Sequence, residues 1–426
     1  MSENSFSILE FKSIYCKKYD IFGMDLEGNL VVSKKVFNEI EQFILKNNEQ
    51  TQFLKPSYKN GLGKVLQAQN YVGLIQTKDG TTIEILPKIQ DVKEDKAKEI
   101  LIKMLKMLKK SPFKNFNMAN LKSSKMPLLE IFITMFLEEL ANLVRKGIKS
   151  DYITKEENLK FLKGKLKVGD QIKQNYIHKE RFFVEYQEFL SDRVENQLIK
   201  TTLQYLYKKS HSNKNQQRIR EFLFVFDEIS ICKDIKNDFL KVKINRQMKN
   251  YEQVLLWCKT FLLENAFSPY KGSDIAFALL FDMNLLFESY VGHYLKKKGL
   301  YVSLQDKGKH LVEEPRKFAL KPDIVITKED KIIIADTKWK IIKEEKDIIQ
   351  NDMYQLFAYG KKYNNDELYL IYPKDGKTQP ALAYKYEKEK KLNLKVLFFD
   401  VENGCFDDDQ QYRIFNLIEK KENDAQ

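Results

Sequence analysis

Three side chains in the last third of the chain have the types and the spacing to cut a phosphodiester bond. They are Asp323, Asp336 and Lys338. Asp323 opens one predicted strand, and Asp336 and Lys338 lie on the next. Because alternate residues of a strand share a face, Asp336 and Lys338 point the same way. A hairpin between the two strands can bring Asp323 close to Asp336.

Two carboxylates that lie close together repel, and a divalent cation relieves that repulsion. Mg²⁺ prefers oxygen ligands and keeps waters, which leaves room for a substrate phosphate. Such an ion can activate water and neutralise the charge that builds on a phosphodiester. Lys338 would then orient the attacking water or stabilise the transition state. The plainer alternatives are a turn residue at Asp323 and an exposed cross-strand charge pair of Asp336 with Lys338.

Side chains on two neighbouring helices could join this site. Glu288 lies on the helix expected before the strands and is a possible third metal ligand. Gln355 and Tyr359 share one face of the helix expected after them, at spacing i, i+4. Each has an ordinary alternative, which is a solvated helix residue for Glu288 and packing at the core edge for Gln355 and Tyr359. Trp339 is expected in the core.

The set as a whole resembles the PD-(D/E)xK nuclease superfamily, with Asp336 in the middle acidic position. An acid on the preceding helix matches Glu288, and the Gln-x-x-x-Tyr pair of RecB-like members matches Gln355 and Tyr359. The resemblance implies a Mg²⁺-dependent endonuclease with a mixed central sheet flanked by helices. It also implies that the helical pair supports the site or contacts the cleaved strand.

The segment YVGLIQTKDGTTIEILPKI, residues 71–89, resembles the N-terminal signature of the McrC family, and so do the helix MNLLFESYV and the order of the acidic residues. McrC proteins are nuclease subunits of modification-dependent restriction systems. The resemblance implies docking on a McrB-like hexameric AAA+ GTPase, stimulation of its GTPase, and double-stranded DNA whose modified cytosine the partner recognises. No G-x-x-x-x-G-K-[ST] occurs, and Gly61–Val65 lacks the upstream glycine and the hydroxyl, so GTP is expected on the partner alone.

Two other functions remain open at this point. One is a stand-alone RecB-like nuclease that acts on DNA ends or branched DNA. The other is an adaptor or activator of an NTPase ring whose nuclease fold is catalytically dead. Dependence on the partner would separate the first from a restriction subunit, and the intact Asp/Asp/Lys set counts against the second.

The elements that must position these residues predict an α/β protein with three regions. Residues 1–115 form a β-rich partner-docking domain, 116–265 a mostly helical basic region, and 266–426 the endonuclease domain. The early pattern predicts a hairpin over 71–89 with its turn at Lys78-Asp79-Gly80. Helices are expected over 100–108, 127–145, 185–208, 214–227, 250–266, 276–298 and 345–363. Late strands are expected over 300–304, 317–327, 331–340, 367–373, 381–387 and 393–401.

Positive charge gathers in the middle of the chain. Residues 101–250 carry 31 basic and 17 acidic side chains, net +14, in a chain of net charge +13. Such a field attracts a phosphate backbone or an acidic protein face, although a solvated lysine-rich surface would look the same. The densest group is Lys241, Lys243, Arg246 and Lys249, which we predict to contact DNA or the partner.

The remaining composition excludes several classes of protein. The four cysteines form no C-x-x-C pair, which argues against a disulfide scaffold, a zinc ribbon and an iron–sulfur cluster. No apolar run approaches the ~18 residues that span a membrane, and no signal peptide is seen at the N-terminus. We therefore expect a soluble cytoplasmic protein.

Overall fold

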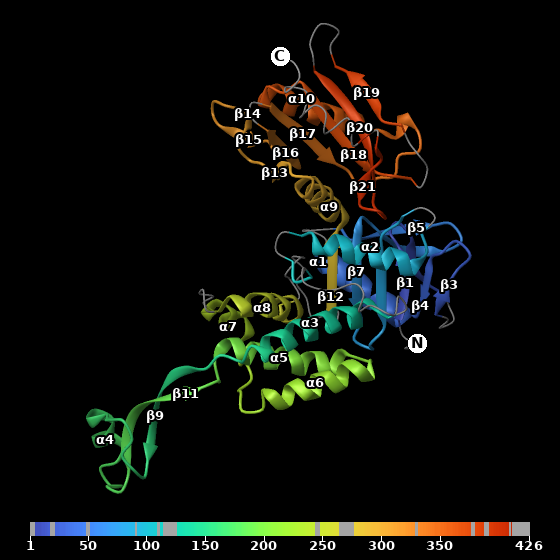
Figure 1. Ribbon diagram of the computed structural model, residues 1–426. Coiled ribbons are helices and arrows are strands. Elements are labelled where there is room, and N and C mark those ends of the chain that lie inside the picture. Colours follow the sequence, from blue (N-terminus) through green and yellow to red (C-terminus); the bar gives the residue numbers. More distant parts are fainter. Residues whose placement is uncertain are drawn as a thin grey trace. The chain divides into compact units, whose positions relative to one another are not determined.

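The computed structural model describes residues 5–17, 22–47, 52–89, 92–108, 111–113, 126–242, 248–263, 277–328, 331–375, 380–386, 392–408 and 410. The chain divides into two compact units (Figure 1). Unit 1 combines Met1–Leu128 with Phe267–Gln426, and unit 2 is Leu129–Ala266. The boundaries expected at 115/116 and 265/266 lie outside the described residues, so the three-region division stays a prediction.

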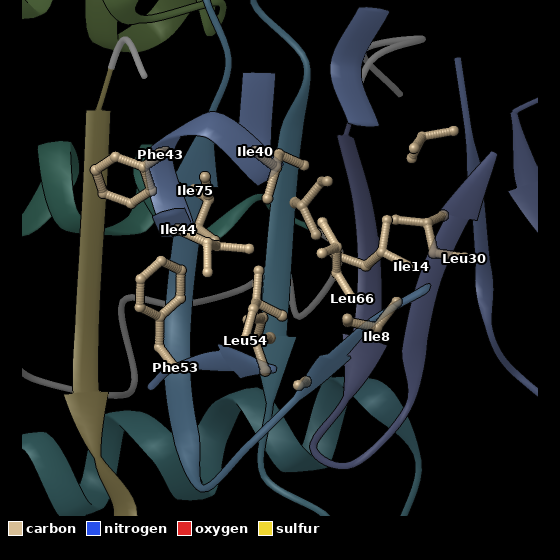
Figure 2. Packing of buried hydrophobic residues seen from close by; sticks show 14 of the residues in the cluster. Ile8, Ile14, Leu30, Ile40, Phe43, Ile44, Phe53, Leu54, Leu66 and Ile75 are labelled. Carbon is tan, nitrogen blue, oxygen red and sulfur yellow. The ribbon is translucent and has the colours of Figure 1, made fainter. Parts of the chain in front are cut away.

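Two sheets begin unit 1, with the strand orders β3-β4-β2-β6-β5 and β1-β8-β7-β12. Their early strands are β1 (Ser5–Leu9), β2 (Ser13–Cys16), β3 (Gly23–Met24), β4 (Leu30–Val32), β5 (Leu54–Lys59), β6 (Gly63–Ala68), β7 (Tyr71–Gln76) and β8 (Thr82–Leu86). Helix α1 (Lys34–Asn47) contributes Ile40 and Ile44 to their common core, where they lie with Leu66 and Ile75 (Figure 2). The β-rich start is confirmed, and so is the hairpin over 71–89, since β7 and β8 pair antiparallel.

The fourth strand of the second sheet comes from much later in the chain. β12 (Phe277–Asp282) pairs antiparallel with β7. The expectation of one helix over 276–298 is therefore wrong at its start, and α9 covers only Met283–Lys297. FALLF is an unbroken apolar run, and such a run is equally compatible with a buried strand and a buried helix. Asp282 marks the start of the helix, because its side chain accepts a hydrogen bond from the Asn284 N–H and caps α9.

The C-terminal part of unit 1 is a seven-stranded mixed sheet of order β13-β16-β17-β18-β20-β19, with β21 paired to β20. Its first three strands are antiparallel, whereas β17, β18 and β20 are parallel. The strands are β13 (Tyr301–Leu304), β16 (Ile324–Lys328), β17 (Lys331–Thr337), β18 (Glu367–Pro373), β19 (Leu382–Lys385), β20 (Asn393–Asp400) and β21 (Cys405–Phe406). The mixed sheet expected from the sequence is confirmed.

Two helices pack on this sheet, and each contacts side chains that point to a different face of it. Ile334, Leu370 and Val396 share a core with Leu356 of α10 (Gln350–Tyr363). Phe399, of opposite parity, packs edge-on against Phe287 of α9. Residues of opposite parity point to opposite faces of a sheet, so α9 and α10 cover different faces. A small hairpin of β14 (His310–Val312) and β15 (Lys317–Ala319) precedes β16, and α2 (Glu94–Lys106) lies against β8 and α9.

Unit 2 is a group of helices with one long hairpin. The helices are α3 (Leu128–Arg145), α4 (Val168–Gln174), α5 (Val194–Lys209), α6 (Asn213–Val225), α7 (Ile235–Lys241) and α8 (Lys249–Leu262). β9 (Asp151–Leu159) and β11 (Phe182–Leu190) pair antiparallel, and β10 (Lys165–Leu166) adds to β11. Figure 1 shows the hairpin reaching away from the helices of its unit, with α4 at its far end.

The hairpin corrects the expectation of one amphipathic helix over 185–208. The strand β11 ends at Leu190, and α5 begins only at Val194. FFVEYQEFL mixes aromatic and acidic residues in a way that fits helical spacing as well as a strand, and pairing with β9 decides the outcome. The middle region is therefore helical only in part. No helix in the described ranges is long and apolar enough to cross a membrane.

Candidate active site

The hairpin of β16 and β17 brings the two aspartates together. Ile324 pairs with Ala335, and the same antiparallel register continued by one residue sets Asp323 opposite Asp336. The backbone N–H and the hydroxyl of Thr337 both donate to Asp323 Oδ2, at 2.8 and 2.9 Å. Asp323 is thus half-buried and held beside the end of β17.

Asp336 is a buried carboxylate, only 2% exposed. Burial, and after it the charge of Asp323, raise its pKa to about 7, while Lys338 acts in the opposite direction. The Lys338 Nζ lies 2.7 Å from Asp336 Oδ2. Burial alone would lower the pKa of Lys338, but the carboxylates around it, Asp336 first, raise it. The alternative of an exposed cross-strand pair is therefore wrong.

Glu288 lies on α9 and is also buried, which excludes the solvated alternative. Burial, with smaller contributions from the charges of Asp323 and Asp336, raises its pKa to about 7. Its Oε2 accepts a hydrogen bond of 2.9 Å from Gln305 Nε2. One turn later Gly292 lets α9 approach β13, because a Cβ there would lie 2.6 Å from Leu304 Cδ2. Glu288 is therefore held near both aspartates, and its role as a metal ligand stays a prediction.

The pair expected on the second helix is in contact with the lysine. Gln355 Oε1 lies 3.3 Å from Lys338 Nζ, and Gln355 Nε2 donates to the Tyr359 hydroxyl at 2.9 Å. Burial, with a contribution from the charge of Asp336, raises the pKa of Tyr359 to about 12. Gln355 and Tyr359 thus form a hydrogen-bonded chain that ends at Lys338. Tyr359 also packs in the core, so it contributes both to core packing and to the support of the site.

Two further residues belong to this group and were not expected. Asp352, one turn before Gln355 on α10, lies 3.8 Å from Lys338 Nζ. Its i, i+3 spacing to Gln355 was a signal that the sequence offered. Gln305 donates its backbone N–H to the Asp323 carbonyl at 2.8 Å and its side chain to Glu288. It adopts a left-handed φ of 53°, which sequence periodicity does not predict.

The donor set can be tested for its fit to Mg²⁺. Within the described residues, no group of three or more His, Cys, Asp or Glu side chains is arranged to hold a metal ion. The electrostatics nevertheless suit a cation, since Asp323 raises the pKa of both Asp336 and Glu288. All three side chains offer the carboxylate oxygens that Mg²⁺ prefers. The residues fit a divalent cation in chemistry and charge.

The basic group predicted to contact DNA or the partner is described only in part. Lys243 and Arg246 lie outside the described residues. Lys241 ends α7 and forms an ion pair of 2.7 Å with Asp238, and Lys249 begins α8. The ion pair offsets part of the charge of Lys241. Its role in binding stays a prediction.

Comparisons with known proteins identify the family and the fold of the chain. Residues 66–373 match the family model described as McrBC 5-methylcytosine restriction system component. No curated protein matches the chain. Among solved structures, a refined half-complex from a tetradecameric assembly of Thermococcus gammatolerans McrB AAA+ hexamers with bound McrC is similar, with 21% identity and a TM-score of 0.70. That match covers 97% of this chain and 100% of the other.

A second solved structure extends the likeness. It is the cryo-EM structure of the Thermococcus gammatolerans McrBC complex, with 20% identity, a TM-score of 0.51, and coverage of 70% of this chain and 89% of that chain. At these identities the two structures establish a shared fold. That fold is mixed α/β with several sheets, as in the matched chains.

Proposed function

The chain belongs to the family of McrBC 5-methylcytosine restriction system components, and from this premise we propose that it is the DNA endonuclease subunit of such a system. The observation that carries the proposal is the pair of aspartates set opposite each other in a mixed sheet, with Lys338 2.7 Å from the buried one. Two adjacent carboxylates with a cationic side chain beside them suit metal-dependent hydrolysis of a phosphodiester.

The roles of the side chains follow from their surroundings. Asp323 and Asp336, with Glu288 as a possible third ligand, would hold Mg²⁺. A bound Mg²⁺ would supply charge neutralisation at the phosphate and a more acidic water. Lys338, drawn between Asp336 and Asp352, is placed to orient the attacking water or to stabilise negative charge in the transition state. Gln355 fixes the ammonium from the helix side.

The proposed partner is a McrB-like AAA+ GTPase hexamer. Two solved structures of similar fold come from assemblies of McrB with McrC. In this scheme the partner binds GTP and recognises the modified cytosine in double-stranded DNA, and this chain docks on the ring, stimulates its GTPase and cuts. Both act in the cytoplasm.

Two surfaces compete for the docking role. The first is the β-rich N-terminal region that the sequence suggests. The second is the hairpin tip, residues 160–181, which joins β9 to β11 and exposes apolar side chains that include Phe161, Leu162 and Ile177. Soluble proteins rarely expose several large apolar side chains together without a partner. We favour the hairpin tip.

The test is cleavage of methylated and unmethylated plasmid by the purified chain, with and without the GTPase of its system, GTP and Mg²⁺. Cleavage of the methylated plasmid only when all components are present is the expected result. Cleavage with Mg²⁺ alone would favour the stand-alone nuclease. Stimulation of GTP hydrolysis without any cleavage would favour the catalytically dead activator.

A further inference from the structure

A buried acid from the first strand region reaches the catalytic strand. Glu10 follows β1 directly and is fully buried. Its Oε2 accepts two hydrogen bonds, from the Lys88 N–H at 3.0 Å and from Trp339 Nε1 at 2.9 Å. Glu10 and Trp339 are 329 residues apart in sequence. The bond therefore joins the N-terminal sheet to the residue that follows Lys338.

Both N–H groups of Trp339 have hydrogen-bond partners. Its backbone N–H donates to Asn284 Oδ1 at 3.2 Å, and its ring packs edge-on against Phe287 with centroids 5.5 Å apart. The preceding N–H, of Lys338, donates to the Ile371 carbonyl at 3.0 Å. The end of β17 is thus fixed on one side by β18, on another by α9, and at the Trp339 side chain by Glu10.

The α9 contact leads back to the same N-terminal sheet. Asn284 donates its N–H to Asp282 Oδ1 at 2.8 Å, and the backbone N–H of Met283 donates to the Asn70 carbonyl at 3.0 Å. Asn70 directly precedes β7, and the ladder of β7 with β12 ends at Asp282. Both supports of Trp339, Glu10 and Asn284, are therefore anchored in the sheet β1-β8-β7-β12.

Burying the Glu10 carboxyl group costs folding free energy, which a purely structural role does not explain. Its Oε1 accepts no hydrogen bond from any residue that the structure describes. Burial raises the pKa of its carboxyl to about 8, against the lowering effect of the Lys88 and Trp339 bonds. An apolar side chain at such a position is commonly at least as stable as a buried, incompletely bonded acid. What an apolar side chain cannot supply is an acceptor for the indole N–H.

We propose that Glu10 is a positioning residue of the nuclease: through its hydrogen bond to Trp339 it fixes the end of β17, and with it the place of Lys338 beside Asp336. The reaction itself rests on the proposed function. The positioning does not, because the bond and its effect on Trp339 can be measured without cleavage. The N-terminal sheet is then part of the support of the catalytic site, in addition to any docking role.

The experiment compares Glu10→Leu, Glu10→Gln and Trp339→Phe in the full chain. Glu10→Leu removes the acceptor, Trp339→Phe removes the donor but keeps a ring, and Glu10→Gln keeps a neutral acceptor. Glu84→Gln is the matched control, because Glu84 is an equally buried acid of the same sheet that bonds Lys98 and the Leu128 N–H instead. Single-turnover cleavage at saturating DNA, DNA affinity and thermal unfolding are measured for each.

We expect Glu10→Leu to lower the single-turnover rate by about 10-fold to 100-fold, the scale of a displacement near 1 Å at a catalytic group. Trp339→Phe should act in the same direction, and DNA affinity should not change. Glu10→Gln should keep most of the rate. The double variant Glu10→Leu/Trp339→Phe should be no slower than the slower single variant, since both break one bond. Equal rate losses in Glu84→Gln and Glu10→Leu, at matched unfolding temperature, would overturn the proposal.

A second readout separates this inference from the proposed function. The chain has two tryptophans, so Trp257→Phe leaves Trp339 as the only indole emitter. In that background Glu10→Leu should shift the emission of Trp339, whereas Glu84→Gln should not. If the protein without the Glu10 change never cleaves DNA but the emission shift is seen, the proposed nuclease function is refuted and the hydrogen bond of Glu10 to Trp339 is supported. Unchanged emission in Glu10→Leu would refute the positioning role even in an active nuclease.

Discussion

The mixed C-terminal sheet and the antiparallel β9/β11 hairpin are both built from paired strands, yet they bury very different numbers of side chains. Six of the seven residues of β18 are buried, and its neighbour β17 carries a buried carboxylate. In β11, nine residues pair with β9, but only Val184 is buried. The C-terminal sheet is held by buried side chains from two helices. The hairpin is held by its ladder of backbone hydrogen bonds and by surface contacts between side chains, such as the 2.7 Å ion pair of Lys155 with Glu188.

This difference in burial suits the two regions to different functions, catalysis in the C-terminal sheet and binding in the hairpin. A catalytic site needs its groups fixed to within a fraction of an ångström, and a packed sheet with buried polar contacts provides that. A thin hairpin cannot fix a catalytic group, but it exposes both faces and its tip to whatever binds it. Changes in the packed region should therefore alter chemistry or global stability, whereas changes in the hairpin should alter association.

The largest effect is expected at the catalytic pair. Asp336→Ala or Asp323→Ala should lower the cleavage rate by roughly 100-fold to 10,000-fold, the range found when a group acting on the transition state is removed. The fold should persist, because Asp336 is a buried carboxylate with a raised pKa and its loss removes an unfavourable burial. Asp400→Ala, at the end of β20, is the control in a cleavage assay with partner, GTP and Mg²⁺. Wild-type cleavage by either site variant would refute the assignment.

The same glycine substitution can be made in both regions. A Cβ on Gly73 of β7 would lie 2.0 Å from the Leu279 carbonyl oxygen of β12, and one on Gly164 beside β10 would lie 2.5 Å from the Glu185 carbonyl oxygen. Both have positive φ. Gly73→Ala should cost about 3 kcal/mol or more of unfolding free energy, since the buried strands must separate. Gly164→Ala should leave the main unfolding transition in place. Denaturant titration measures both, and equal losses would contradict the comparison.

The pH dependence of stability tests the buried acid of the packed unit. The ordinary pKa of a glutamate carboxyl group is 4.5, and burial raises the pKa of Glu10 to about 8. Between these values the unfolded chain releases the proton and the folded chain keeps it, so the unfolding free energy falls as pH rises from about 5 to 8. The loss can reach about 1.4 kcal/mol per pH unit. Glu10→Gln should lack this component, and identical slopes in denaturant titrations would contradict it.

Association should respond to the hairpin tip. Phe161→Ser with Leu162→Ser should weaken binding to the AAA+ partner by about 10-fold or more, the scale for loss of exposed anchors at an interface. Thermal unfolding should not change, because both side chains are exposed in the free chain. Phe224→Ser is the control, because Phe224 is an even more exposed apolar residue on α6. If the affinity of the tip variant for the AAA+ partner is unchanged, the N-terminal region is favoured as the docking surface.

The smallest effect is expected from the basic group of unit 2. Changing Lys241, Lys243, Arg246 and Lys249 to Gln should weaken DNA binding without altering preference for a modified base, because phosphate contacts carry little sequence information. Each lost contact should flatten the log–log salt dependence by about one unit. Lys241 should contribute least, given its ion pair with Asp238. Titration against DNA and against partner at two salt concentrations distinguishes a DNA contact from a partner contact.

Local patterns predicted much of the fold and the centre of the site. The Asp79-Gly80 turn predicted the β7/β8 hairpin, and Pro127 predicted the start of α3 at Leu128. The strand alternation placed Asp336 and Lys338 on one face, and they are in contact. These features depend on neighbours within a few residues, or on one hairpin, which is where sequence periodicity carries information.

What the sequence did not predict depends on distant contacts. Whether Phe277–Asp282 is helix or strand is decided by β7, and whether Phe182–Leu190 is helix or strand is decided by β9. Gln305 joins Asp323 to Glu288 through a left-handed turn that has no periodic signal. The bond of Glu10 to Trp339 spans most of the chain. None of these partners can be identified from spacing along one segment.

The pairing of β7 with β12 has a consequence for synthesis. Gln76 and Phe277 are neighbours in the sheet but about 200 residues apart in sequence. At ~5–20 residues per second, the ribosome needs roughly 10 to 40 s to make the intervening chain. During that time β7 is an unpaired edge, and such edges readily pair with other chains. Unit 2 emerges in this interval and can fold first, so unit 1 is completed only after the inserted unit has left the ribosome.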